Sequence, residues 1–589
     1  MKESLQVTIV ILVVLVLAGI GTLLVTALSN VDGDLVVDHY TAHLATDGTF
    51  QETYDYNVKT NGRYTMLYRY WEEPVTYLTP LGSTYIEVTS VHSPYYSYVK
   101  DYAGTVWLSS YPDISTKAYD NEIGFYNPDY FQAGHYTLQI NYTLVPPVET
   151  DGHYYHLNLK LASRHVTYKD IEISIDDPNN DIVHLYTHPQ MTVTQTTGGY
   201  TISGSSPANT LLEIEVLSRN ITYGYHTTVA DVYQKTVSAN DAYTSTTNFV
   251  NTLNTVLFSL VIGFFLIVII VYTTTGREKR FVVPDYLNVM PSKRKPWRVN
   301  LVFVKSAEDF NPNGFYATLL DLHQRKIITI ESEDEKNIVI RINQPNALDL
   351  DEYEKRVMEF LTHWAHDNTF STVMFEETVK AMKGSLRLLP AQQDLHYLLR
   401  SADRSVSREF IKSGRKIPAI LAGVGAVLFF ISIVLFGTFG NVYPMTGTAC
   451  AYSLVFILQA LVMTAAPPEL FGQWKDEYYK EKQEWESFRK FLLDMAHLEQ
   501  YKLQDLSVWK EWLVYGTTLG VGTELVKEMK HLNIHVPEAT FVPAMHTSFI
   551  GINAAVWASM SSGGHGGGGF GGGGFGGGGG FGGGGAGGR

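Results

Sequence analysis

Six histidines in the N-terminal part of the chain are the residues best suited to chemistry. They fall between residues 135 and 188, with acids such as Asp151 and Asp170 among them: His135, His153, His156, His165, His184 and His188. Imidazole nitrogens and carboxylates are zinc ligands, so these residues could in principle hold a metal. The simpler interpretation, which we adopt, places them at solvated strand and loop positions of a tyrosine-rich sheet.

A second group of candidate ligands lies at helical spacing in the middle of the chain. Glu359, His363 and His366 occupy positions i, i+4 and i+7, so a helix would present them on one face. The group lacks the second histidine of an HExxH motif and has no thiol nearby. We therefore predict a solvated helix face. Cys450 is the single cysteine, which excludes an intramolecular disulfide and any site that needs two thiols.

Motifs of known enzyme classes are otherwise missing from the sequence. It contains no GxSxG, HExxH, P-loop or zinc motif. SxxK occurs at Ser97–Lys100 and Ser507–Lys510, without the SDN and KTG elements that accompany it in enzymes. GxGxxG occurs only in the glycine-rich end, where no strand or helix would present it to a phosphate. We expect no catalytic, cofactor-binding or metal-binding residue, and predict that the protein is not an enzyme.

Uncharged apolar segments set the organisation of the chain. Only 17% of its 589 residues are charged, against about 25% in soluble domains. Three windows lack Asp, Glu, Lys and Arg altogether: Val7–Leu28, Ala242–Gly276 and Ile417–Pro468. About 18 apolar residues suffice to cross a bilayer. The windows predict an anchor helix or signal peptide at 1–28, a transmembrane helix at 249–275 and a transmembrane helical hairpin at 417–466.

Lysine and arginine counts orient these helices. Residues 29–248 carry 10 Lys and Arg against 25 Asp and Glu, whereas residues 276–416 carry 23 against 20. Seven of the 23 cluster between Arg277 and Arg298, directly after the second window. Basic residues near helix ends stay in the cytoplasm. We therefore predict a multi-pass plasma-membrane protein with residues 29–248 outside and residues 276–416 and 467–589 in the cytoplasm.

Residues 29–248 have the pattern of half-buried β-strands. They hold 27 of the 38 tyrosines, and HYTLQINYTLV (135–145) and HYYHLNLKLA (153–162) alternate with a period of two. Asp47-Gly48 separates two further runs of this kind, which is a hairpin signal. We expect an outer all-β, sandwich-like domain.

The predicted cytoplasmic part has three regions. Residues 276–416 contain a helix followed by the strand-like runs IITIES and NIVIRI and a second amphipathic helix, which predicts an α+β winged-helix-like domain. Residues 467–560 predict a helical region, with a long helix over 471–501. Residues 561–589 form a glycine-rich tail, with 21 glycines in the last 27 residues. Because such a composition cannot build a core, we predict that the tail is disordered.

Several stretches resemble the YciQ-like family of predicted membrane proteins, a prokaryotic family defined as a domain of unknown function. They are VDHYTAHLATDGTFQETYDYNVKTNGRYTMLYRYW (37–71), FYATLLDLHQRKIITI (315–330), LDEYEKRVMEFL (350–361), KQEWESFRKFLLDM (482–495) and WKEWLVYGTTLGVGTELVKEM (509–529). The resemblance covers about Val36 to Arg589 and implies the same order of anchor, outer domain, helix, cytoplasmic domain, hairpin and C-terminal region. It implies no catalytic residue, cofactor or substrate, and it suggests envelope partners such as small coiled-coil proteins of the LemA type.

These observations favour a binding or scaffolding component of the cell envelope, with an outer recognition domain and a cytoplasmic partner-binding domain. A transmembrane sensor is the alternative, and an envelope enzyme that uses the outer histidines is a third. A winged helix also suggests DNA binding, but a net charge of +3 over residues 276–416 is weak for nucleic acid. The membrane surface explains the basic cluster without DNA. The expected partners are the lipid bilayer and other envelope proteins.

Overall fold

The computed structural model describes most of the chain and forms two compact units, a β-rich unit and a helical unit. The described residues are 3–29, 32–77, 85–334, 337–344, 349–382, 388–440, 442–443, 445–494, 499, 506–558 and 581–589. The last segment, Phe581–Arg589, belongs to the β-rich unit although it is far from it in sequence.

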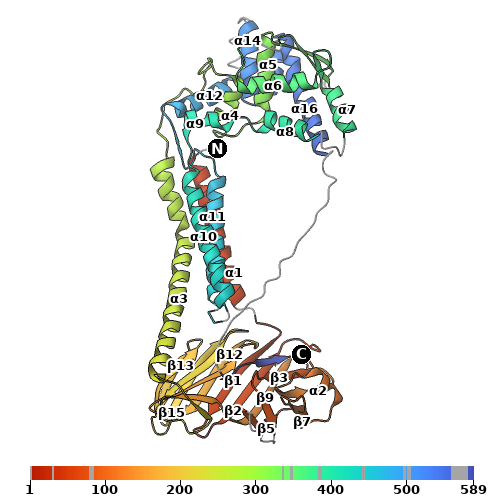
Figure 1. Ribbon diagram of the computed structural model, residues 1–589. Coiled ribbons are helices and arrows are strands. Elements are labelled where there is room, and N and C mark those ends of the chain that lie inside the picture. Colours follow the sequence, from red (N-terminus) through yellow and green to blue (C-terminus); the bar gives the residue numbers. More distant parts are fainter. Residues whose placement is uncertain are drawn as a thin grey trace. The chain divides into compact units, whose positions relative to one another are not determined.

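The largest sheet of the β-rich domain has eight strands among the described residues (Figure 1). In sheet order these are β14 (Thr192–Thr196), β15 (Gly199–Ser206), β12 (Tyr168–Asp176), β1 (Leu35–Leu44), β2 (Thr49–Val58), β9 (Gly134–Leu144), β5 (Ile86–His92) and β4 (Val75–Tyr77). β1 and β2 pair as an antiparallel hairpin. Gly48 has φ 83° at its turn, a conformation that favours glycine, and the hairpin prediction is confirmed.

Two further sheets of the β-rich domain lie within the described residues. One contains β13 (Ile182–His188), β16 (Leu212–Ser218), β11 (Tyr155–Ala162), β10 (Pro147–Thr150) and β17 (Tyr225–Thr228), with β23 (Phe581–Gly582) paired to β11. The other contains β24 (Gly585–Gly588), β3 (Met66–Tyr70), β8 (Glu122–Tyr126), β6 (Tyr96–Lys100) and β7 (Val106–Trp107), and the short helix α2 (Pro112–Lys117) precedes β8. Residues of all three sheets, such as Tyr54, Leu157 and Phe125, share one hydrophobic core.

The end of the glycine-rich tail is ordered, contrary to our prediction. Residues 561–580 lie outside the described part of the chain. Phe581–Arg589, however, supplies β23 and β24, and Figure 1 shows the C-terminal end among the strands of the β-rich domain. The prediction was wrong here because it considered only apolar side chains, whereas this segment is held through its backbone hydrogen bonds.

Among the described residues, four helices are long and apolar enough to cross a membrane: α1 (Glu3–Ser29), α3 (Val232–Val271), α10 (Lys416–Phe439) and α11 (Thr446–Ala465). α3 starts 17 residues before the predicted 249, and a π-helical turn at Tyr272–Gly276 follows it. The early start has a simple reason. Residues 232–248 contain neither proline nor glycine, so the helix continues through a polar stretch that hydropathy alone does not reveal.

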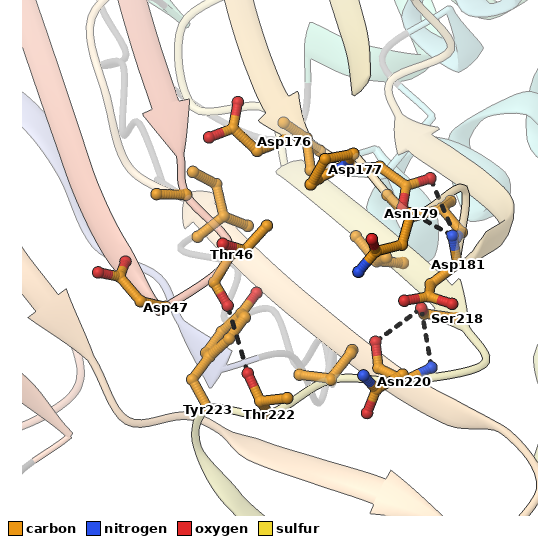
Figure 2. Close-up of a pocket in the computed structure, with 17 residues that line it drawn as sticks. Thr46, Asp47, Asp176, Asp177, Asn179, Asp181, Ser218, Asn220, Thr222 and Tyr223 are labelled. Carbon is orange, nitrogen blue, oxygen red and sulfur yellow. Dashed lines mark hydrogen bonds between the residues drawn. The ribbon is translucent and has the colours of Figure 1, made fainter. Parts of the chain in front are cut away.

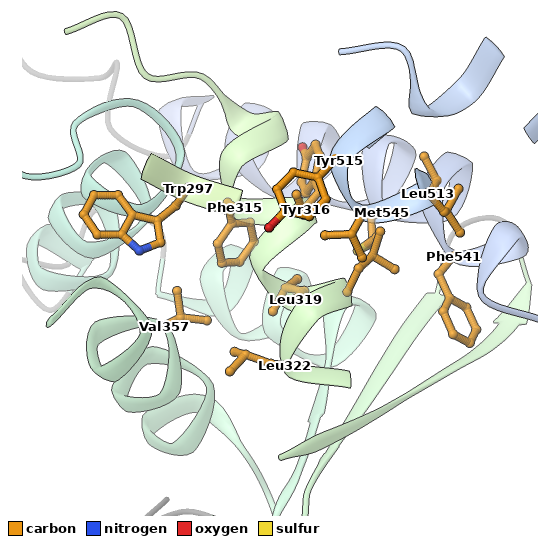
Figure 3. Close-up of a cluster of buried hydrophobic side chains, with 14 of the residues drawn as sticks. Trp297, Phe315, Tyr316, Leu319, Leu322, Val357, Leu513, Tyr515, Phe541 and Met545 are labelled. Carbon is orange, nitrogen blue, oxygen red and sulfur yellow. The ribbon is translucent and has the colours of Figure 1, made fainter. Parts of the chain in front are cut away.

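The helical domain brings together the two regions that flank the hairpin. Its elements are α4 (Pro296–Phe303), α5 (Pro312–Gln324), β18 (Ile328–Asp334), β19 (Asn337–Ile342), α6 (Glu352–Trp364), β20 (Thr369–Ser371), α7 (Thr372–Ala381), α8 (Leu388–Arg400), α9 (Ser407–Phe410), β21 (Ile411–Lys412), β22 (Gln473–Trp474), α12 (Tyr478–Leu493), α14 (Leu506–Thr518), α15 (Gly522–His531) and α16 (Phe541–Ala558). We predicted two separate regions, at 276–416 and 467–560. Instead, Leu319, Val357, Leu513 and Met545 lie in one core (Figure 3).

Local signals account for the elements of this domain. The Asp351 side chain accepts a hydrogen bond from the Glu354 backbone N–H, and the Glu354 side chain accepts one from the Asp351 backbone N–H. This capping box starts α6. β18 and β19 form the predicted hairpin, with β20 as a third strand. α12 is shorter than predicted and ends at Leu493. Whether this arrangement is a winged helix stays a prediction.

Candidate recognition site

A buried arginine on β3 marks the most unusual chemistry of the β-rich domain. Arg69 has no exposed surface. Its Nε lies 3.4 Å from a carboxylate oxygen of Glu52, and its guanidinium stacks 3.8 Å above the ring of Trp71. Nη1 donates to the carbonyl oxygens of Tyr70, at 2.5 Å, and Gly583, at 2.9 Å. A buried charge is costly unless it is paired and hydrogen-bonded, so this arginine depends on its partners.

Tyrosines complete the surroundings of this ion pair. Glu52 accepts hydrogen bonds from the hydroxyl of Tyr40, at 2.7 Å, and from that of Tyr142. Burial opposes the charge of Arg69, yet Tyr54 and Glu52 beside it raise the pKa of its guanidinium. The arginine therefore stays charged inside the domain. Sequence reasoning missed this pair, although Glu52 stands where the alternation of β2 calls for a buried side chain.

The strand β24 pairs with β3, the strand that carries Arg69. The pairing is antiparallel, with Gly585 opposite Tyr70 and Gly588 opposite Leu67. At its end, the carbonyl oxygen of Arg589 accepts from the N–H groups of Thr65, at 2.7 Å, and Met66, at 3.0 Å. We call Phe581–Arg589 the docked segment and Thr65–Tyr70 the β3 edge.

The docked segment is also hydrogen-bonded along its opposite side. The N–H of Gly583 donates to the backbone carbonyl of Lys160 at 2.6 Å. The carbonyl of Gly584 accepts from the backbone N–H groups of Ser163, at 2.7 Å, and Arg164, at 2.8 Å. The carbonyl of Ala586 accepts from Val166, at 3.0 Å. Because both sides of the backbone are paired, the segment lies in a slot between β3 and residues 160–166.

Glycine is required at most positions in this slot. A Cβ on Gly584 would lie 2.0 Å from the carbonyl oxygen of Tyr70, and one on Gly585 would lie 2.2 Å from that of Arg164. Both glycines also have positive φ, 81° and 152°, which other residues rarely adopt. Between the end residues Phe581 and Arg589, Ala586 is the exception, since its side chain fits and is 2% exposed. The slot therefore selects a glycine-rich strand by shape.

An arginine fixes the end of the docked segment. The guanidinium of Arg589 pairs with the carboxylate of Glu122, whose side chain is fully buried. It also lies 4.3 Å from the ring of Tyr68 and 3.9 Å from that of Tyr119, distances typical of cation–π contacts. Burial raises the pKa of Glu122, while Arg589 and a hydrogen bond from Tyr98 oppose that rise. Arg589 is thus the charge that compensates this buried acid.

The six histidines do not form one centre. His135 lies beside Asp55, His165 is buried with its ring nitrogens near two carbonyl oxygens, and His184 lies near Tyr233. His153 is exposed. Within the described ranges, no group of three or more His, Cys, Asp or Glu residues is arranged to hold a metal ion.

Two of the histidines, His156 and His188, both contact one carboxylate, that of Glu215. Nε2 of His156 lies 3.1 Å from one oxygen of Glu215, and Nε2 of His188 lies 3.2 Å from the other. Asn240 of α3 donates to Glu215 at 2.9 Å. Burial would raise the pKa of Glu215, but hydrogen bonds from His156, His188 and Asn240 lower it to about 2. Burial would lower the pKa of His156, but Glu215 and Glu149 raise it. The cluster joins the sheet to the start of α3.

Glu359, His363 and His366, which the sequence places at helical spacing, do not all lie on α6. Glu359 and His363 lie on the helix and line a hollow of about 460 Å³. His366 follows the last helical residue, and its side chain is largely exposed. The three residues therefore do not share one helix face, because the helix ends at Trp364. Of the two SxxK matches, Ser97–Lys100 lies on β6, where Lys100 donates to the carbonyl of Ala118 at 2.9 Å.

A hollow of about 340 Å³ lies between loops of the β-rich domain (Figure 2). Several acids line it, but the carboxylate oxygens of two of them already accept hydrogen bonds from backbone N–H groups. Asp177 accepts from the N–H groups of Asp181, at 2.7 Å, and Ile182, at 3.1 Å. Asp47 likewise accepts from Thr49 at 2.9 Å. These acids hold turns, so the docked-segment slot remains the better candidate for recognition.

The β-rich domain, the long apolar helices and the helical domain together are the parts of a membrane protein. Models of one family match both parts. The N-terminal domain of the "Predicted membrane protein (DUF2207)" family matches residues 38–218, and its C-terminal domain matches residues 283–529. The chain belongs to this family, whose function is unknown, and the predicted resemblance is confirmed.

Other comparisons add little. No curated protein matches the chain. Among solved structures, an M1 zinc metallopeptidase from Deinococcus radiodurans aligns with 12% identity over 31% of this chain and 42% of that one, with a TM-score of 0.18. A substrate-bound mutant of the same enzyme aligns with 11% identity over the same shares, with a TM-score of 0.19. The chain thus spans less than half of these proteins, and scores this low support no argument about fold or activity.

Proposed function

We propose that this protein is a binding or scaffolding component of the cell envelope, in which the β-rich domain recognises a ligand outside the plasma membrane. One observation carries the proposal. The β3 edge pairs with a segment more than 500 residues away in sequence, through backbone hydrogen bonds and an arginine. Addition of a strand to an exposed sheet edge is a common mode of peptide recognition.

The distribution of charge supports the orientation in this proposal. The basic cluster at Arg277–Arg298 follows α3, and few basic residues lie in the β-rich domain. By the positive-inside rule the helical domain is cytoplasmic and the β-rich domain is outside. We assign the outer domain a sandwich-like packing of its sheets and the helical domain a winged-helix-like part that binds protein partners.

The proposed role is binding rather than catalysis. The histidines best placed for chemistry, His156 and His188, are committed to Glu215. The partners we propose are other envelope proteins, with small membrane proteins of the LemA type as the first candidates, and not nucleic acid. The low net charge of residues 276–416 supports that choice.

Co-purification from native membranes under mild extraction tests the proposal. We expect a stoichiometric protein partner that is retained by the full chain and absent from a matched preparation of an unrelated multi-pass protein. If the chain comes out alone, or with a tightly held metal or small molecule in place of a protein, the scaffolding role is wrong.

A sensor is the second candidate, and α3 favours it. This helix runs without a break from Val232 to Val271, and at its start Asn240 donates to Glu215 of the sheet. Tyr243 packs on His188 one turn later, with ring centroids 3.9 Å apart. A rigid helix fixed to the ligand-binding domain could carry a change across the membrane. A ligand-dependent change in hydrogen exchange within α4–α9 would support this role, and its absence with bound ligand would exclude it.

A further inference from the structure

We infer that a hollow beside the ends of three apolar helices binds the negatively charged headgroup of a phospholipid. The hollow has a volume of about 330 Å³, and all of its lining residues belong to the helical unit. Three lysines and three aromatic residues are among them: Lys279, Lys412, Lys475, Phe281, Trp474 and Tyr479. The inference concerns another part of the chain than the β3 edge, so it goes beyond the proposed function.

The lining residues come from the chain segments that connect the candidate spans to the helical domain. Lys279 closely follows the span that contains α3, Lys412 closely precedes α10, and Gln473 follows α11. Where such helices cross a bilayer, their ends lie in its polar headgroup region. The hollow therefore lies where a lipid headgroup can reach it.

Backbone contacts hold these segments together around the hollow. β21 pairs with β22, which sets Lys412 opposite Gln473. The N–H of Trp474 donates to the carboxylate of Glu278 at 2.8 Å, and this bond joins the segment after α3 to the segment after α11. The lining is thus built on paired backbone from three parts of the chain.

Two glycines allow the segments to approach so closely. A Cβ on Gly276 would lie 2.0 Å from the carbonyl oxygen of Leu470, and one on Gly472 would lie 2.0 Å from that of Lys412. No side chain can be accommodated at such distances. The glycines therefore bring Lys279 and Lys412 to the same hollow.

The charges around the hollow suit an anion. Lys279 and Lys412 are exposed, and neither forms an ion pair with a carboxylate in the described part of the chain. The ammonium group of Lys475 donates to the carbonyl of Arg408 at 2.5 Å, so its partner is neutral. Lysine is a common phosphate ligand that acts as a point charge. Three such charges favour a phosphate over a neutral ligand.

Glu278, an acid in the lining, opposes an anion only weakly at neutral pH. Burial raises the pKa of its carboxyl group to about 7, although the hydrogen bond from Trp474 opposes the rise. The charges of Glu3 and Glu469 raise the pKa further, and that of Lys482 lowers it. The group is therefore partly protonated at pH 7, and an anion in the hollow should bind more tightly as the pH falls.

Aromatic side chains favour a lipid over a soluble phosphate. The ring centroid of Tyr479 lies 6.4 Å from that of Trp474 and 6.5 Å from that of Phe281. Tryptophan and tyrosine are enriched at the headgroup level of membranes. A free phosphate has no apolar part to place against these rings, whereas a phospholipid has its glycerol and acyl carbons. Basic pockets at the cytoplasmic side of membrane helices bind anionic headgroups in this way.

Native mass spectrometry of the full chain in mild detergent tests the inference. Equal amounts of phosphatidylglycerol, which is anionic, and phosphatidylcholine, which has no net charge, are added, and the peaks with one bound lipid are compared. We expect a preference for phosphatidylglycerol. It should fall by about fivefold for each of Lys279→Gln, Lys412→Gln and Lys475→Gln, and disappear when the three are combined.

The matched control replaces three exposed lysines on α12 and α15 that do not line the hollow, in the combined variant Lys490→Gln, Lys527→Gln and Lys530→Gln. This variant should keep the preference of the parent chain. Thermal unfolding of both combined variants shows that they are folded, and the single variants give the same answer in smaller steps. No preference in the parent chain, or a preference that survives all three lining substitutions, would overturn the inference.

Two further measurements identify the ligand and the role of Glu278. If a large excess of inorganic phosphate removes the preference for phosphatidylglycerol, a soluble phosphate is the ligand and the lipid is wrong. The preference should be larger at pH 6 than at pH 8, and Glu278→Gln should make it equal at both. A parent chain with equal preference at both pH values would contradict the place of Glu278 in the site. None of these outcomes bears on a co-purified protein partner, so the proposed function is tested separately.

Discussion

Replacing Glu215 with glutamine should destabilise the β-rich domain in a pH-dependent way. The carboxylate is bound by His156, His188 and Asn240 at 3.1, 3.2 and 2.9 Å, and its pKa falls from 4.5 to about 2. Each pH unit corresponds to about 1.4 kcal/mol, so the folded state gains about 3 kcal/mol from ionisation of this group. The same free energy is shared with the histidines and is not counted twice.

The way this stabilisation changes with pH follows from the shifted pKa values of Glu215 and His156. Because the pKa of Glu215 is lowered, its contribution is present above pH 4.5 and is lost as the pH falls towards 2. Because the pKa of His156 is raised from 6.5, its contribution is present below 6.5 and is lost as the pH rises through the folded value. Stabilisation by the cluster is therefore greatest between about pH 4.5 and 6.5.

Calorimetry of the full chain measures this effect. The β-rich domain should melt several degrees lower in Glu215→Gln than in wild type at pH 6, and the difference should shrink at pH 3 and at pH 9. Glu172→Gln, which changes an exposed acid on β12, is the control and should leave the transition unchanged. A Glu215→Gln variant that melts like wild type at pH 6, or whose loss of melting temperature is the same at all three pH values, would contradict this role of the Glu215 carboxylate.

Three further outcomes are expected. Leu319→Ala should destabilise the helical domain by about 3 kcal/mol, because the side chain is fully buried in the core; denaturant unfolding followed by tryptophan fluorescence measures it, and a loss below about 1 kcal/mol would show a looser core. Glu354→Gln should cost about 3 kcal/mol, because it leaves Lys295 and Arg325 without their buried carboxylate; the same assay decides, and a neutral result would contradict the pairing. Glu122→Gln should lower the melting temperature of the β-rich domain by several degrees, because it leaves the guanidinium of Arg589 without its fully buried carboxylate; an unchanged transition in calorimetry would contradict the role of this acid.

Local patterns in the sequence predicted much of the fold. The β1–β2 hairpin follows from Asp47-Gly48 between alternating runs, and α6 follows from its apolar face and the acids at its start. The charge-free windows likewise predict apolar helices. These predictions succeed because residues close in sequence determine the structure.

The candidate site could not be predicted in the same way. Arg69 meets Glu52 only because β2 and β3, which belong to different sheets, contribute to one core, and Arg589 meets Glu122 across most of the chain. Composition predicts disorder for the docked segment, since it contributes almost no apolar side chain. Its order comes from backbone pairing in a slot that other strands form. The same holds for the helical domain, where helices on both sides of the hairpin share a core.

Placement of the two domains on opposite sides of the membrane is the claim on which the account depends most. In a Cys450→Ser background, Thr194→Cys marks an exposed position on β14 and Glu352→Cys an exposed position on α6. A membrane-impermeant maleimide applied to intact cells should label Thr194→Cys at once and Glu352→Cys only after permeabilisation. Labelling of both positions in intact cells, or of Glu352→Cys alone, would contradict an outer recognition domain.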